Sequence, residues 1–255
     1  MKLATWNVNS LAVRLPQLLA WLTANPVDAL VLQETKLSDD KFPRAEIEAA
    51  GYGVAFHGQK TYNGVALLSR GGVAQDVVKN IPGFDDDMAR VIAGTVDGVR
   101  VIGGYFPNGQ APDSDKFVYK MRWLDALRGF VADEMTRHPQ LVLMGDFNIA
   151  PEDRDVFDPV AWAGQIHCTP EERAHFQMLC GLGLVDAFRL FEQPPRSWSW
   201  WDYRNLAFRK NQGLRIDIIL VSQALQAQVQ ACSIDKAMRK NERPSDHAPV
   251  VVTLA

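Results

Sequence analysis

Carboxylate, amide and histidine side chains recur in this sequence beside short apolar runs. Asp246 and His247 precede the run Val250 to Leu254, which is typical of a buried strand. Residues of the same kind adjoin other apolar runs, namely Asn7, Asn9, Glu34, Asp146, Asn148 and Asp217. A carboxylate in such a poorly hydrated place costs several kcal/mol unless a cation or hydrogen-bond donors compensate. The recurrence predicts that these residues share a bound cation.

The set is rich in oxygen ligands and contains one histidine and no cysteine. Mg²⁺ and Mn²⁺ prefer carboxylate, amide and water oxygens, so we expect one of these ions rather than zinc, working on phosphate. Taken singly, each carboxylate has an ordinary explanation. Glu34 could pair with nearby Lys36, and Asp246 could fix a turn. Asp217 could pair with Arg215, which lies on the same face of its strand.

Strands must carry most of these residues. Apolar, β-branched runs span residues 3–8, 28–34, 64–69, 90–96, 99–105, 140–146, 214–221 and 248–254. The segment 113–138 has helical spacing, with one apolar face formed by Phe117, Met121, Leu124, Leu127 and Val131. A second helix is predicted to begin at Thr169, with Pro170 in its first turn and Glu172 completing a capping box. These elements predict a mixed α/β protein.

The composition is that of an ordinary soluble chain. Its 255 residues are 47% hydrophobic and 22% charged, without a linker, low-complexity tract or repeat, which favours one domain over residues 1–255. No apolar window is long enough to span a membrane, and Asn7 and Asn9 interrupt any signal-peptide core. The odd number of cysteines, 3, and the absence of a C-x-x-C pair argue against disulfides and a structural zinc site. We therefore expect a cytoplasmic, monomeric protein.

The net charge of −3 gives no overall attraction for nucleic acid, but residues 196–215 are locally basic. This stretch contains five basic residues and one acid, interleaved with Trp198, Trp200, Trp201, Tyr203 and Phe208. Such a composition suits phosphate neutralisation and base stacking. For Trp198 and Trp201, burial on one face of a strand is an equal alternative. The basic residues of 236–243 are either a second backbone contact or a solvated loop.

Seven short segments together resemble one protein family. They read "TWNVNSL", "LQETK", "YFPNG", "GDFNIAP", "TPEER", "GLRIDIIL" and "SDHAPV". In this order and at these spacings they resemble the exonuclease III and abasic-site endonuclease family of DNA repair nucleases, within the DNase I-like phosphoesterase superfamily. The resemblance covers nearly the whole chain. It implies a four-layered α/β sandwich, two packed mixed sheets flanked by helices, with the active site where strand ends meet.

The resemblance also implies roles on the metal side of the site. Glu34 corresponds to the principal metal ligand, and Asn7 would support both that ligand and a phosphate oxygen. Asp246 would be a second or water-mediated ligand. Asn9 stands where some relatives have an aspartate, which makes the metal shell of this chain less acidic.

The catalytic roles carry over in the same way. His247 would touch the scissile phosphate, with Asp217 fixing its tautomer. Asp146 would orient or deprotonate the attacking water, Asn148 would hold the phosphate, and Tyr105 would contact it or assist the leaving group. Either Asp146 or the His247 and Asp217 pair is compatible with the role of general base. Metal, base and phosphate contacts must cooperate, because a base alone supplies only about 3 to 5 kcal/mol.

The substrate side departs from the family pattern at one place. Trp200 matches a position that lines the nucleotide pocket, and Arg204, Leu214 and Asn9 are further expected substrate contacts. Relatives that cleave abasic sites have a small residue followed by phenylalanine where this chain has His167 and Cys168. An imidazole would partly fill the slot that receives a flipped abasic sugar.

We therefore expect a Mg²⁺- or Mn²⁺-dependent enzyme acting on duplex DNA with damaged or blocked 3′ ends. It would be a 3′-phosphatase or 3′-phosphodiesterase and a 3′-to-5′ exonuclease, with weak cleavage at internal abasic sites. Three alternatives remain: a full abasic-site endonuclease, in which His167 swings into solvent; a phosphoinositide or sphingolipid phosphodiesterase; and an inactive nucleic-acid-binding module.

Overall fold

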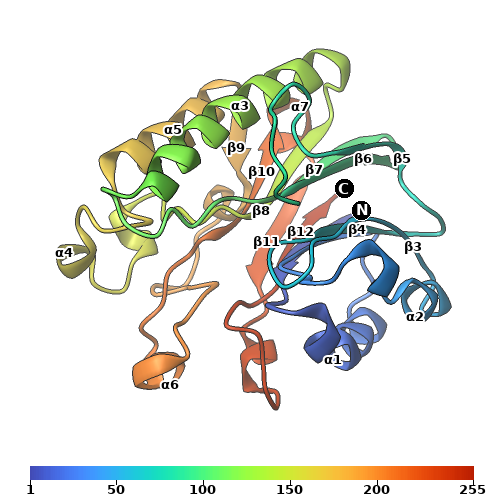
Figure 1. Ribbon diagram of the computed structural model, residues 1–255, viewed down its shortest axis with the longest axis horizontal. Coiled ribbons are helices and arrows are strands. Elements are labelled where there is room, and N and C mark those ends of the chain that lie inside the picture. Colours follow the sequence, from blue (N-terminus) through green and yellow to red (C-terminus); the bar gives the residue numbers. More distant parts are fainter.

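The computed structural model describes all 255 residues and contains two six-stranded mixed sheets packed face to face (Figure 1). The first sheet has the order β11-β12-β1-β2-β4-β3. Its strands are β1 (Lys2–Asn7), β2 (Ala29–Gln33), β3 (Tyr52–His57), β4 (Val65–Arg70), β11 (Val229–Ile234) and β12 (Val250–Leu254). The second sheet has the order β5-β6-β7-β8-β10-β9. Its strands are β5 (Gln75–Lys79), β6 (Val91–Val96), β7 (Val99–Tyr105), β8 (Leu141–Asp146), β9 (Leu184–Asp186) and β10 (Asp217–Ser222).

Helices cover the outer face of each sheet. The helices α1 (Leu11–Ala24) and α2 (Arg44–Ala49) pack on the first sheet, and α3 (Asp115–Arg137) and α5 (Pro170–Gly181) pack on the second (Figure 1). Three short helices lie at the periphery: α4 (Pro159–Trp162), α6 (Ala207–Lys210) and α7 (Gln223–Gln226). One apolar core fills the space between the sheets, and another lies beneath each helical layer. The expected four-layered α/β sandwich is therefore confirmed.

The two predicted helices form as expected. In α3 the Ser114 side chain accepts a hydrogen bond from the Phe117 N–H, and the apolar face is buried against the second sheet. In α5 the Thr169 hydroxyl accepts from the Glu172 N–H, and the Glu172 carboxylate accepts from the Thr169 N–H, which is the predicted capping box. No helix is both long and apolar enough to cross a bilayer.

Strand register brings the polar residues to one edge. β7 and β8 are parallel with Tyr105 opposite Asp146, and β10 runs antiparallel to β8 with Asp217 also opposite Asp146. In the first sheet, β1 and β2 are parallel, so that Asn7 and Gln33 end side by side and Glu34 follows at once. Because the two sheets face each other, both sets of strand ends open onto the same place.

Candidate active site

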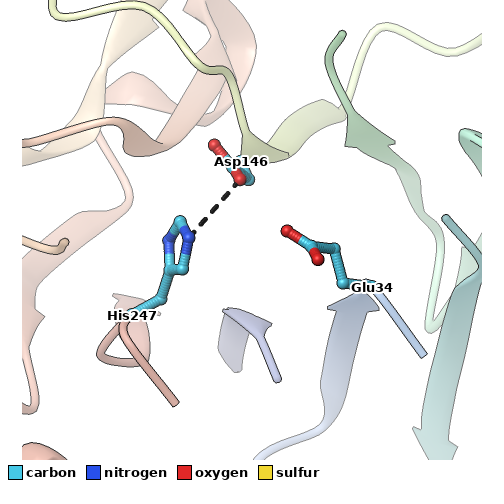
Figure 2. Close-up of side chains that lie close together, drawn as sticks. All are labelled: Glu34, Asp146 and His247. Carbon is cyan, nitrogen blue, oxygen red and sulfur yellow. Dashed lines mark ion pairs between the residues drawn. The ribbon is translucent and has the colours of Figure 1, made fainter. Parts of the chain in front are cut away.

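Glu34, Asp146 and His247 converge at this edge from three different strands (Figure 2). Glu34 directly follows β2, Asp146 ends β8, and His247 lies shortly before β12. One ligand atom from each of the three lies within 4.8 Å of the others. This is the only cluster of three or more acidic, histidine or cysteine side chains in the chain that is tight enough for a metal ion.

Asn7 ties two of these carboxylates together. Its Nδ2 atom donates to Glu34 Oε1 at 2.8 Å and to Asp146 Oδ2 at 2.9 Å. The Lys36 ammonium lies 2.9 Å from Glu34 Oε2. Burial raises the pKa of Glu34, but Lys36 and the Asn7 amide outweigh it and hold that pKa below its usual value. Glu34 is therefore an ionised carboxylate. It pairs with Lys36 and also belongs to the cluster, so the ion pair and the place in the site are not alternatives.

Asp146 has the opposite electrostatic environment. The side chain is buried, and burial raises the pKa of Asp146 to about 7, although attraction to His247 limits the rise. Its Oδ1 atom accepts from the Asn148 N–H at 2.9 Å, and Oδ2 lies 3.7 Å from His247 Nε2 (Figure 2). The carboxylate is thus held on both sides and titrates near neutral pH.

His247 is held by a second carboxylate. Its Nδ1 atom lies 2.8 Å from Asp217 Oδ2, which leaves Nε2 facing Asp146. Burial lowers the pKa of His247, but the negative charges of Asp217 and Asp146 outweigh it and raise the pKa to about 10. His247 is therefore an imidazolium at neutral pH. The expected contact of Asp217 with His247 is present, and the alternative pairing of Asp217 with Arg215 is wrong, because Arg215 instead binds Asp155 and Asp186.

The donor set fits a hard divalent cation. Two carboxylates, Glu34 and Asp146, share one buried opening and one amide donor, with only oxygen ligands besides the His247 ring. Asp246 does not join them. Its Oδ1 accepts from Asn9 Nδ2 at 3.0 Å and its Oδ2 from Trp200 Nε1 at 3.0 Å. Glu34 is the residue placed to hold a cation, with Asp146 and the His247 ring beside it, and the ligand role of Asp246 stays a prediction.

Tyr105 borders the same opening at the end of β7. Burial, and after it the charges of Glu34 and Asp146, raise the pKa of Tyr105 well above its usual value, so the phenol stays neutral and can donate. The Arg90 guanidinium lies 5.0 Å from the centre of the Tyr105 ring and donates to the Tyr105 carbonyl at 3.2 Å. Asn148 Oδ1 lies nearby, 3.4 Å from Asn108 Nδ2.

His167 lies against the site and not in solvent. The side chain is 6% exposed, and its Nδ1 donates to the Asn148 carbonyl at 2.7 Å. The ring stands between the indoles of Trp162 and Trp200, at centroid distances of 6.2 and 6.5 Å. Burial lowers the pKa of His167 to about 4, and the Lys120 charge acts in the same direction. The His167 ring is therefore buried and neutral, and not in solvent as that alternative required. Weak cleavage at abasic sites stays a prediction.

The aromatic stretch divides into site and core residues. Trp200 pairs through its backbone with Leu214 and lies beside His247. Trp198 and Trp201 are buried in a small apolar cluster, as the packing alternative predicted, but the segment that carries them is a loop and not a strand. Arg204 is exposed and pairs with Asp202, with no contact to the cluster.

In the other basic stretch, residues 236–243, the buried Arg239 donates to the Ser245 carbonyl. This arginine therefore holds the neighbouring loop at Ser245 in place, which is neither of the two roles predicted for the stretch.

Two serines that the sequence did not single out hold the site in place. The Ser199 hydroxyl accepts from the Asp217 N–H at 2.9 Å, and the Ser245 hydroxyl donates to the Asn7 carbonyl at 2.7 Å. Ser245 is the first residue of the segment "SDHAPV", so the motif could have pointed to it. Ser199 lies between two tryptophans and carries no sequence signal of its own.

Known proteins share this arrangement. Residues 4–247 match the Endonuclease/Exonuclease/phosphatase family. The chain is 36% identical to exodeoxyribonuclease III of Haemophilus influenzae over 263 residues, covering 98% of each chain. Among solved structures, it is 52% identical to the 3′ phosphatase NExo from Neisseria, a D146N form bound to a product DNA hairpin. That pair has a TM-score of 0.98 and covers 100% of this chain and 99% of the other.

An AP endonuclease from Archaeoglobus fulgidus is also similar, at 35% identity, with a TM-score of 0.95 and coverage of 100% of this chain and 99% of that one. The match to the family model, the near-complete coverage of each relative and the site described above agree. The chain therefore belongs to the endonuclease/exonuclease/phosphatase family of phosphoester hydrolases, with the fold and relatives of the exonuclease III group.

Proposed function

We propose that this protein is a Mg²⁺- or Mn²⁺-dependent DNA repair nuclease that works at damaged or blocked 3′ ends of duplex DNA. It would remove 3′-phosphates and 3′-phosphodiesters and degrade DNA from 3′ to 5′, with weak action at internal abasic sites. The observation that carries the substrate preference is the buried His167 ring between Trp162 and Trp200, beside the phosphate-cleaving cluster. The relatives named as a 3′ phosphatase and as a 3′-5′ exonuclease, NExo, support action at 3′ ends.

Glu34 would be the main ligand of the metal ion, supported by Asn7, with Asp146 next to it. When bound, such an ion polarises a phosphoryl oxygen and stabilises the charge that develops on it. The carboxylate of Glu34 is ionised and free of any proton that would compete with the cation, because its pKa is held low by Lys36 and Asn7 after burial has raised it.

Asp146 is the better of the two candidates for general base. A base works best when its pKa lies near the working pH, and the pKa of Asp146 is raised by burial to about 7. His247, with a pKa raised to about 10 by Asp217 and Asp146 against the effect of burial, already carries its proton. It would instead donate Nε2–H to the phosphate, while Asp217 holds the ring. Asn148 and the neutral Tyr105 phenol would hold the phosphate and assist the leaving oxygen.

The surroundings of Tyr105 suit a nucleic acid strand. A cleft of 560 Å³ beside it is lined by aromatic, amide and basic side chains, among them Tyr62, Arg90, Asn108, Lys116 and Tyr119. Tyr62 is 68% exposed, which leaves its ring free for a base or sugar. The enzyme would be a monomer built on a single domain. Trp200 and Asn9 would line the opposite wall, whereas Leu214 is fully buried and pairs with Trp200 through its backbone.

The 3′-end preference follows from the cost of flipping. An internal nucleotide must leave the duplex at a cost of a few kcal/mol, and contacts in the receiving slot must offset that cost. The neutral imidazole of His167 would occupy space there, and its Nδ1 donates to the Asn148 carbonyl. A terminal nucleotide can fray into the site without that cost.

The test compares initial rates on a duplex with a 3′-phosphate, a duplex with an internal abasic site, and a lipid phosphodiester. We expect the wild type to prefer the 3′-phosphate by at least about tenfold, and His167→Gly to raise the abasic-site rate relative to the 3′-phosphate rate by at least about tenfold. The backbone at His167 has φ 74°, which glycine adopts without strain, so the variant should fold. Equal wild-type rates on the two duplexes, or no gain in the variant, would refute the preference. Faster lipid hydrolysis would refute DNA as the substrate.

A further inference from the structure

A lysine is buried on the face of α3 that packs toward the core. Lys120 is 0% exposed and forms an ion pair with Glu172, which is also 0% exposed. Removing two charges from water costs several kcal/mol per ion, and two apolar residues of similar volume would fill these positions at less cost. Stability alone therefore does not account for a lysine here.

The ammonium joins three segments that border the active site. An ammonium has three N–H donors, and Lys120 Nζ has three acceptors. These are the Asn108 carbonyl after β7 at 3.3 Å, the Asn148 carbonyl after β8 at 2.8 Å, and the Glu172 carboxylate in the first turn of α5. The same Glu172 oxygen accepts from the His167 N–H at 3.1 Å.

Asn148 depends most on this arrangement. Its φ of 50° is in the left-handed region, which costs free energy unless the surroundings hold it. Its carbonyl accepts from both Lys120 Nζ and His167 Nδ1, and its N–H donates to Asp146 Oδ1. Its side chain donates to the Phe106 carbonyl at 2.9 Å. Without Lys120, one of the two donors that fix this backbone is lost.

We infer that Lys120 is a positioning residue, which holds Asn148 and the neighbouring loops in the geometry that binds the phosphate. It touches neither substrate nor metal and acts through the Asn148 carbonyl. The inference rests on the proposed function, in which Asn148 contacts the phosphate.

The same helix provides a matched control. Glu134, near the other end of α3, pairs with Arg100, and these side chains are 1% and 2% exposed. Arg100 lies near the start of β7 and also donates to the Asp76 carbonyl, whereas Tyr105 and the site lie at the end of that strand. Arg100→Met and Lys120→Met each remove the cation of a buried pair, but only the second lies beside the site.

The experiment measures kcat and KM on the 3′-phosphate duplex, corrected for the folded fraction found by denaturant unfolding. We expect Lys120→Met to lower kcat by at least about tenfold and Arg100→Met by less than about threefold. Combined with Asn148→Ala, Lys120→Met should lower kcat by less than a further factor of about three, because both changes act through one contact. Equal effects of the two methionine variants, or full multiplication of the losses in the double variant, would overturn the inference.

If Lys120→Met does not fold, Lys120→Gln takes its place, because its amide can still donate to one carbonyl. The same thresholds for the loss of kcat then apply. If neither folds while Arg100→Met does, the lysine is needed for folding and the inference is wrong. An inactive wild type would reject the proposed function and this inference with it. An active wild type matched by Lys120→Met would reject the inference alone.

Discussion

The two halves of the active site are built differently. The half that would perform the chemistry comprises Asn7, Glu34, Asp146, Asp217 and His247, all at or near strand ends. Hydrogen bonds of 2.8 to 2.9 Å join Asn7 to Glu34 and Asp146 and join Asp217 to His247, and an ion pair of 3.7 Å links Asp146 to His247. The half that would receive the substrate comprises His167, Trp200 and Arg204, none of which lies in a strand of either sheet. Sheet register fixes the first half as a unit. Each member of the second half is held by its own neighbours, so substitutions there can alter selectivity and leave the chemistry in place.

Removing the metal should have the largest effect, because it disables the chemistry half for every substrate. We expect excess chelator to abolish hydrolysis of the 3′-phosphate and abasic duplexes alike, and Mg²⁺ or Mn²⁺ to restore both, with zinc a poor substitute. Circular dichroism before and after chelation controls for unfolding. Full activity in excess chelator would reject Glu34 as a ligand.

Single substitutions in the chemistry half come next. Asp146→Asn and His247→Asn should each lower kcat by at least about 10²-fold on both duplexes, because these groups would act mainly in the transition state. DNA affinity, measured by fluorescence anisotropy, should change little. A parallel loss of affinity would instead assign these residues to binding or structure, and the contrast between the halves would disappear.

In the substrate half, His167 should make the free energy of unfolding fall as the pH becomes acidic. Burial lowers its pKa to about 4, so between that value and its ordinary 6.5 the unfolded chain takes up a proton that the folded chain does not. This contribution to stability is complete above pH 6.5 and is lost as the pH falls toward 4.

Between pH 7 and 5 the wild type should therefore lose about 2 kcal/mol, or about 30-fold in the unfolding constant, that His167→Gly does not lose. Urea unfolding of both proteins at the two pH values measures this difference. Identical losses would show that the ring is not held neutral.

Arg204 should have the smallest effect. It is 82% exposed and already pairs with Asp202, so Arg204→Ala is expected to change kcat/KM by less than about threefold. If Arg204 contacts a phosphate in the DNA complex, Arg204→Ala should reduce the slope of log affinity against log salt by about 1. A tenfold loss of kcat/KM in Arg204→Ala at moderate salt would instead show that this arginine binds substrate, as the sequence predicts.

The same division explains how far the sequence could be read. The chemistry half could be located because acids and amides stand out against apolar strands, and all eight predicted runs contain strands in the structure. Four strands were not predicted. β9 has only three residues, and β3, β5 and β11 alternate too weakly to be recognised. Helix α1 was missed as well, although its buried residues follow helical spacing.

Side-chain partners were harder to predict than positions. Arg215 lies two residues before Asp217 yet pairs with Asp155 and Asp186, which are distant in sequence. The run 214–221 also begins as a strand only at Asp217, because Leu214 pairs with Trp200 instead. Such choices depend on loops whose paths no local pattern reveals.

The pairing of β1 with β12 has a consequence for biosynthesis. β1 is made long before β12, one of its two neighbours in the sheet, and Lys2 lies opposite Thr253. The loop that carries His247 precedes β12 directly, so Asn7 and Glu34 are also made long before their catalytic partner. Contacts this distant in sequence form slowly. A nascent chain whose synthesis has not yet reached His247 should therefore be unable to cut DNA.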